Sequence, residues 1–137
     1  MTGFARRAVC AALPALIATA AAAAAPAFWK GGSLTLSEAA ALRDAGEVVR
    51  QIASGADPNA TYPLRPGILD ASSLTPLEAA VDSRRAEMVD VLMGHGAKVS
   101  ADEWHRLHCA ALHLRASDLV STLSRYRPDG AATSCEG

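Results

Sequence analysis

A helix-start signal followed closely by two short apolar stripes, between residues 74 and 100, restricts the fold of this chain more than any other sequence feature. The Thr75 hydroxyl can accept a hydrogen bond from a free amide at a helix start, and Glu78 completes a Thr-x-x-Glu capping box. Pro76 fits the first helical position, where no amide donor is needed. The sequence therefore predicts that a helix begins just after Thr75.

The apolar residues after Thr75 recur at the i, i+3 and i+4 spacing of one helix face, but a polar run at residues 82–85 interrupts them. Such a break favours two short amphipathic helices over one long helix. Gly96 suits the left-handed backbone position that follows a helix end. The apolar positions are Leu77, Ala80 and Val81 before the break, and Met88, Val89, Leu92 and Met93 after it.

The same pattern occurs earlier in the chain, where Thr35 and Glu38 form a second capping box. The apolar residues and the closing glycine of this earlier stretch precede their counterparts by 41 positions. One offset that covers both helices and the turn indicates an internal repeat. The earlier members are Leu36, Ala39, Ala40, Val48, Ile52 and Gly55.

A third pair of helices is predicted after residue 100, although it lacks the Thr-Pro and Gly-Ala signatures. Ser100 or Asp102 can cap its first helix, with Glu103 in the first turn. Ser117 and Asp118 are expected to cap its second helix. The apolar positions are Trp104, Leu107, Ala110, Ala111 and Leu114 in the first helix, and Leu119, Val120, Leu123 and Tyr126 in the second.

The stretch at residues 74–100 resembles an ankyrin repeat. Thr75-Pro76-Leu77 matches the helix-opening motif of that family, and His95-Gly96-Ala97 matches its exit turn. The sequence departs from the family at Glu78, where histidine is usual. It also departs at Arg84, where the family usually has a glycine that can adopt positive φ in the turn between the helices.

The resemblance implies an all-α fold, a short ankyrin-like solenoid of about three helical hairpins within residues 34–126. The hairpins are expected at residues 34–60, 74–101 and 102–126. Because the family's period is about 33 residues, an offset of 41 implies an insertion of roughly 8, which places an inserted loop at residues 61–73. Aromatic residues make up only 4% of the chain, which also favours closely packed helices with small side chains.

The resemblance further implies a non-enzymatic module that binds a protein partner. Loops of stacked repeats often lie at the binding edge, so we expect the partner to contact the inserted loop and the face of the helix after Thr75. Alternatively, the apolar loop residues fold back and cover the small core. The candidate partner-binding residues are Tyr62, Leu64, Arg65, Ile68 and Leu69 in the loop, and Glu78 and Asp82 on the helix.

The charge balance argues against a nucleic-acid partner. The chain has 13 basic and 14 acidic residues, and loss of Arg6 and Arg7 with a leader would leave a net charge of −3. The sequence contains no Gly-rich phosphate loop and no nucleophile elbow, so we expect neither enzymatic activity nor a cofactor. We expect a monomer.

The first 27 residues have the order of parts found in a secretory signal peptide. Arg6 and Arg7 precede an apolar, alanine-rich run, and Ala25-Pro26-Ala27 provides the small residues of a cleavage site. Residues 28–33 would form a short lead-in to the domain. The sequence therefore predicts a periplasmic or secreted protein without stable membrane association after cleavage. The alternative is an uncleaved membrane anchor, since about 20 apolar residues can span a bilayer.

Cys109 and Cys135 are the two cysteines that remain after residue 27, and an exported protein meets an oxidising compartment. A disulfide between them is the simplest pairing and would close a loop of about 25 residues, worth roughly 3 kcal/mol. It would tether the polar tail, residues 127–137, which is otherwise expected to be loose. The competing interpretation is a Zn²⁺ or Cu⁺ site from His105, Cys109 and His113 on one helix face. Three ligands so spaced extend over about 12 Å, which is too far for one ion, and we therefore expect no metal.

Two further functions are compatible with these features. The first is an immunity or inhibitor protein that binds an exported toxin through the inserted loop. The second is a metal or redox accessory protein that uses the histidines and cysteine of the helix after residue 100. Elemental analysis with thiol titration separates this last class from the binding proteins.

We predict that export removes the chain up to Ala27, so that the mature protein begins at Phe28. Intact-mass analysis of the periplasmic protein tests this prediction. A mass that still includes residues 1–27 would support the membrane anchor instead.

Overall fold

The computed structural model describes residues 32–135, which contain six helices and one pair of short strands. The predicted signal peptide lies outside the described residues. None of the described helices combines the length and apolar character that crossing a bilayer requires. The elements are α1 (Leu36–Ala41), α2 (Ala45–Ala53), β1 (Tyr62–Pro63), β2 (Ser73–Leu74), α3 (Pro76–Asp82), α4 (Ala86–Gly94), α5 (Ala101–His113) and α6 (Ser117–Arg125).

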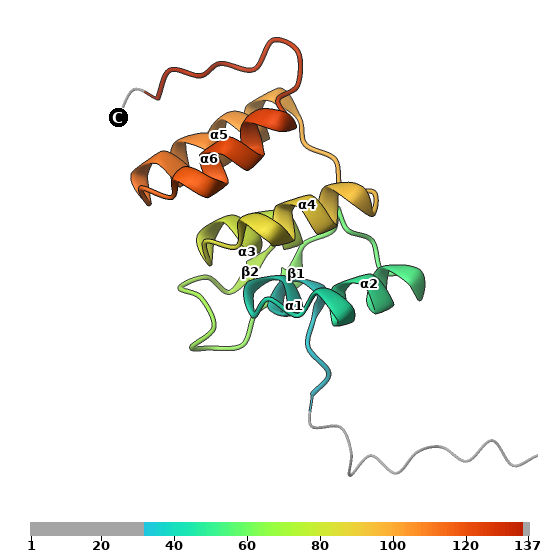
Figure 1. The fold of residues 1–137 in the computed structure, drawn as a ribbon. Helices are drawn as coiled ribbons and strands as arrows, with labels where there is room; N and C mark the ends of the chain where they lie inside the picture. Colours follow the sequence, from blue (N-terminus) through green and yellow to red (C-terminus); the bar gives the residue numbers. More distant parts are fainter. Residues whose placement is uncertain (1–31, 136–137) are drawn as a thin grey trace, which may run out of the picture. The chain divides into compact units, whose positions relative to one another are not determined.

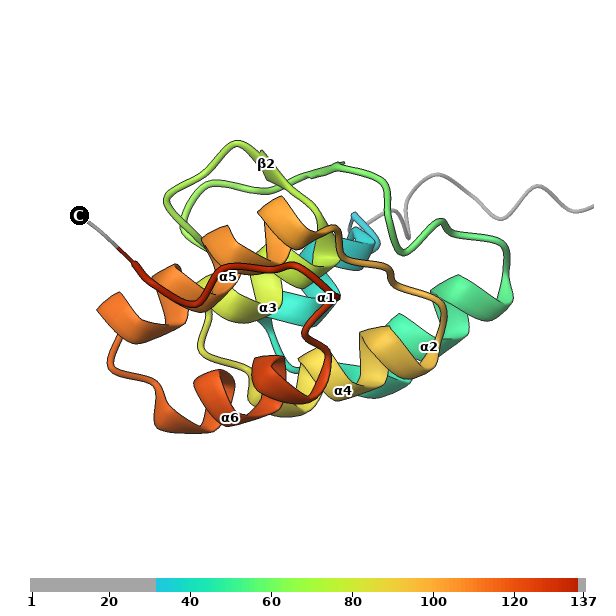
Figure 2. The same cartoon turned by 90° about the horizontal axis from the view of Figure 1, so that it is seen from above.

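The helices form three consecutive hairpins, α1–α2, α3–α4 and α5–α6 (Figure 1). Helix α3 packs against both α1 and α5, and helix α4 packs against both α2 and α6. Figure 2 shows the first helices of the hairpins on one side and the second helices on the other. The structure is mostly helical, as the prediction of an all-α fold requires in part, but it also contains a small sheet that the sequence did not indicate.

Both predicted capping boxes are present. The Glu38 amide donates to Thr35 Oγ1 at 3.2 Å, and the Thr35 amide donates to the Glu38 carboxylate at 2.9 Å. Thr75 and Glu78 repeat these two bonds at the same distances. Ser100 caps α5 through the Glu103 amide, also at 3.2 Å.

The predicted cap of α6 by Ser117 and Asp118 is wrong. Ala116 occupies the cap position without a side-chain hydrogen bond, and Ser117 is already the first helical residue. In the turn before α6 the amides of Arg115 and Ala116 donate to the carbonyls of Leu112 and Ala111.

Arginine, not glycine, adopts the left-handed conformation in all three turns between paired helices. Arg43, Arg84 and Arg115 have φ values of 66°, 58° and 52°. In the central turn the amides of Arg84 and Arg85 donate to the carbonyls of Val81 and Ala80 at 2.9 and 2.8 Å, which is the Schellman pattern of a helix end. A left-handed residue with a Cβ costs about 1–2 kcal/mol, and these bonds offset that cost.

The first two hairpins do not keep one offset throughout. Thr35 and Thr75 lie 40 positions apart, whereas Arg43 and Arg84 lie 41 apart, because α3 has seven residues and α1 has six. The predicted constant offset of 41 is therefore wrong at the helix start and correct from the turn onward.

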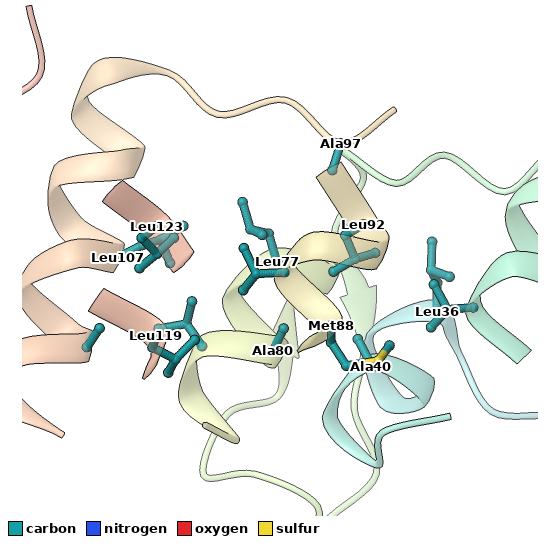
Figure 3. Packing of buried hydrophobic residues seen from close by; sticks show 14 of the residues in the cluster. Leu36, Ala40, Leu77, Ala80, Met88, Leu92, Ala97, Leu107, Leu119 and Leu123 are labelled. Atoms are coloured by element: carbon teal, nitrogen blue, oxygen red, sulfur yellow. The ribbon is translucent and has the colours of Figure 1, made fainter. Parts of the chain in front are cut away.

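The core extends through all three hairpins and is centred on α3 and α4 (Figure 3). Ala39, Ala40 and Ala80 have no exposed surface, so the backbones of α1 and α3 approach closely. Leu77 and Leu92 contribute the larger side chains of the central hairpin. Every apolar position predicted for the core is buried or half-buried in the structure.

The inserted segment forms a two-stranded antiparallel sheet, with Tyr62 opposite Leu74 and Pro63 opposite Ser73. The Leu64 amide extends the pairing by donating to the Ser72 carbonyl at 2.9 Å. The segment between the strands is therefore closed at its base.

Residues 127–135 of the C-terminal tail lie along α5 (Figures 1 and 2), whereas the sequence led us to expect a tail that is loose except at the disulfide. Cys135 forms the predicted disulfide with Cys109, and the Ala131 side chain is 2% exposed. The Arg127 guanidinium donates to the Ala131 carbonyl and lies 5.7 Å from the centre of the Trp104 ring.

We predict that Leu92→Ala lowers the free energy of unfolding by about 2–5 kcal/mol, because α4 packs on both sides and collapses poorly around a cavity. Thermal or chemical denaturation measures the change. Leu112→Ala is the matched control, because Leu112 is 44% exposed and should shift stability little. Equal effects of the two substitutions would contradict the packing described here.

Candidate functional site

The inserted loop is fixed to the body of the protein by the Glu38 carboxylate. The Arg65 amide donates to Glu38 Oε1 at 2.8 Å, and the Arg65 guanidinium donates to both carboxylate oxygens at 2.9 and 3.2 Å. Glu38 is 1% exposed, whereas half of the Arg65 side chain remains in solvent. The same carboxylate thus caps α1 and holds the loop.

Burial by itself would raise the pKa of Glu38. The hydrogen bonds from the Arg65 side chain, from the Thr35 and Arg65 amides, and the attraction of the guanidinium outweigh burial and hold this pKa below its ordinary value of 4.5. Glu38 is therefore ionised at neutral pH, as the ion pair requires.

Further hydrogen bonds hold the base of the loop in place. The Ser37 hydroxyl donates to the Leu74 carbonyl at 2.7 Å, and the Thr35 hydroxyl donates to the Pro63 carbonyl at 3.0 Å. The Tyr62 hydroxyl donates to the Asp57 carbonyl at 2.8 Å. The loop is consequently a preorganised edge of the molecule.

Some of the predicted loop residues cover the core, and others face solvent. Leu64 is 8% exposed, so its side chain covers the core and is not available to a partner. Tyr62, Ile68 and Leu69 are half-buried. Arg65 is exposed but already paired with Glu38.

One surface pocket, of about 360 Å³, joins the loop to the helices. Leu69 and Asp70 contribute the loop wall, Asp82 comes from the end of α3, and Ala110, His113 and Leu114 come from the end of α5. Leu69 and Asp82, predicted separately from the sequence as partner-binding residues, therefore line the same pocket.

The pocket has an acidic rim. Desolvation, followed by repulsion from Glu78, raises the pKa of Asp82 above its ordinary value of 3.8. Glu78 itself lies on α3, where one carboxylate oxygen caps the helix start and the other is 3.7 Å from the Arg106 guanidinium. A positively charged group in the pocket would relieve the repulsion at Asp82.

The three histidines of α5 lie in different environments. His113 lines the pocket, whereas the side chain that the structure brings to His105 and Cys109 is that of Cys135. His108 is buried and stacks on Trp104 with 4.6 Å between ring centres. His105 lies beside the disulfide, with Nε2 3.8 Å from Cys109 Sγ.

Sequence reasoning missed three contributions to this region. Glu38 was interpreted only as a capping residue, because its bonds to Arg65 depend on the path of the loop. Asp70 carried no motif, and His113 was considered only as a metal ligand; the two line one pocket because the loop folds toward the end of α5.

No known protein family, curated protein or solved structure matches the chain. The function is therefore inferred from the geometry of the described residues.

We predict that Glu38→Gln lowers the free energy of unfolding at pH 7 by about 1.5–3 kcal/mol, because glutamine keeps the cap but loses the charged bonds to Arg65. The folded-state pKa of Glu38 lies below the unfolded one. Its stabilisation is therefore complete above pH 4.5 and is lost as the pH falls through the folded pKa. The difference between wild type and variant should shrink in acid, as measured by denaturant titrations at pH 7 and pH 3.

Glu47→Gln is the matched control for this prediction. The pKa of Glu47 is also lowered, by hydrogen bonds from Arg50 and Gln51, but this carboxylate makes no contact with the loop. A stability loss and pH dependence no larger for Glu38→Gln than for Glu47→Gln would refute the anchoring role.

Proposed function

We propose that this chain is a small exported ankyrin-type protein that binds another protein in the periplasm and has no enzymatic activity of its own. The ankyrin assignment is supported by the capping boxes at Thr35 and Thr75 and by the alignment of α1, α3 and α5. The left-handed residues Gly55 and Gly96, which follow α2 and α4 at an offset of 41, also support it.

The observation that carries the binding proposal is the pocket between the loop and the ends of α3 and α5. Leu69 and Leu114 provide apolar walls, while Asp70 and Asp82 provide acidic groups. A long basic side chain of a partner fits both requirements, because lysine and arginine combine an apolar stem with a cationic end. The partner surface is therefore proposed to present a lysine or arginine to this pocket.

The preorganised loop supports a specific, tight complex. Ordering a flexible loop on binding reduces affinity, and the bonds from Glu38, Ser37 and Thr35 already hold this one in place. A tight complex is what an immunity or inhibitor protein that binds an exported toxin would need, so this feature favours that alternative function. It is also compatible with a general binding role. Identification of the partner by affinity capture from a periplasmic extract separates the two.

We predict that Asp82→Asn weakens binding to the captured partner by at least about tenfold, or 1.4 kcal/mol, without lowering stability. The folded state raises the pKa of Asp82, so its ionised form costs folding free energy at neutral pH and the amide removes that cost. Calorimetric titration and thermal melts of the same sample test both parts. Binding that requires the ionised carboxylate should also weaken as the pH falls through this raised pKa.

Asp129→Asn is the control, because it removes one exposed carboxylate from the tail, outside the pocket. Leu69→Ser should weaken binding with little change in melting, whereas Leu64→Ala should lower the melting temperature because Leu64 is buried. Unchanged affinity in folded Asp82→Asn and Leu69→Ser proteins would exclude the pocket as the binding site.

A further inference from the structure

Three metal-ligating side chains meet where the C-terminal tail crosses α5. One ligand atom each from His105, Cys109 and Cys135 lies within 4.8 Å of the other two. His105 and Cys109 are one helical turn apart on α5, and the tail brings Cys135 to them. This set differs from the linear arrangement on one helix, because the tail replaces the distant His113.

A backbone contact fixes the tautomer of His105. Its Nδ1 lies 2.9 Å from the Ala132 carbonyl oxygen, which can only accept a hydrogen bond, so Nδ1 carries the proton. The lone pair is then on Nε2. Both ring nitrogens lie 3.8 Å from Cys109 Sγ, so the imidazole must rotate for Nε2 to face a cation beside this sulfur. Metal-binding histidines typically donate their other N–H to a backbone carbonyl or carboxylate, which fixes tautomer and ring orientation.

The donor set defines the class of cation. Two thiolates and one neutral imidazole suit soft and borderline ions with a filled d shell, such as Zn²⁺ and Cu⁺, rather than Mg²⁺ or Ca²⁺. His108 is a further donor beside the cluster, with its Nδ1 3.9 Å from Cys135 Sγ.

We propose that reduction of the Cys109–Cys135 disulfide creates a binding site for one Zn²⁺-class cation, with His105, Cys109 and Cys135 as ligands. A dithiol supplies the two electrons and two protons, so that it becomes a disulfide while Cys109 and Cys135 become thiols. Each thiol releases its proton when its sulfur binds the cation.

The rearrangement required for binding is small. A disulfide holds its sulfurs about 2 Å apart, and two thiolates on a tetrahedral zinc ion with bonds of about 2.3 Å lie roughly 3.8 Å apart. Rotation of the Cys135 side chain on the tail can provide this separation. The cation would then keep the tail on α5 after the covalent bond is lost, so one contact region holds the tail in both redox states.

The test is a Zn²⁺ titration of the full chain, reduced with a phosphine that is then removed under argon. A competing chromogenic chelator reports the affinity. We expect one equivalent to bind to the reduced protein, at least about tenfold more weakly to reduced His105→Asn, and none to the oxidised protein at the same concentrations. Reduced His113→Asn is the control on the same helix and should bind as wild type does.

Co²⁺ provides a second measurement, because thiolate-to-cobalt charge-transfer absorption requires cysteine ligation. The band should appear in the reduced wild type and be lost in Cys135→Ser, while circular dichroism reports whether the helices persist. Wild-type affinity in His105→Asn, or equal binding by the oxidised protein, would overturn the proposed site. Absence of stoichiometric Zn²⁺ binding by the reduced wild type would also overturn it, whatever the outcome of the partner-binding experiments.

Discussion

The Glu38 carboxylate is the interaction on which the loop side of the domain depends. It is almost completely buried, yet it stays charged because two amides and the Arg65 guanidinium bind its oxygens. Removing one partner of a buried ion pair leaves the other uncompensated, which is far more costly than losing an exposed pair. The start of α1, the path of the loop and the wall of the pocket beside it are therefore coupled through one side chain.

Local signals in the sequence predicted the starts of α1, α3 and α5 and most of the core, but not the start of α6. Capping boxes and apolar spacing depend on residues within one or two turns, and Thr35, Thr75 and Ser100 act as predicted. The left-handed conformation of the turn residues was not predicted, because arginine has no intrinsic preference for positive φ. At Arg84 the conformation is held by backbone bonds from Arg84 and Arg85 to the last turn of α3, which the residue type alone does not indicate.

The candidate sites depend on contacts between distant parts of the chain, and this limited their prediction. Leu69 and Asp82 could be selected from their positions in a loop and on a helix. Their convergence with His113 could not, because it requires the fold of residues 61–73. Likewise, helical spacing suggested His113 as a third metal-ligating side chain beside His105 and Cys109. In the structure the tail brings Cys135 there instead.

The tail that Cys135 holds on α5 also affects how far the row of helices can continue. Helix α3 packs on one side of α5, and the tail runs along the outer side of the same helix (Figures 1 and 2). Another helix, from this chain or from a second molecule, could pack there only by displacing the tail. The Cys109–Cys135 bond therefore keeps this outer side of α5 covered by the chain's own tail.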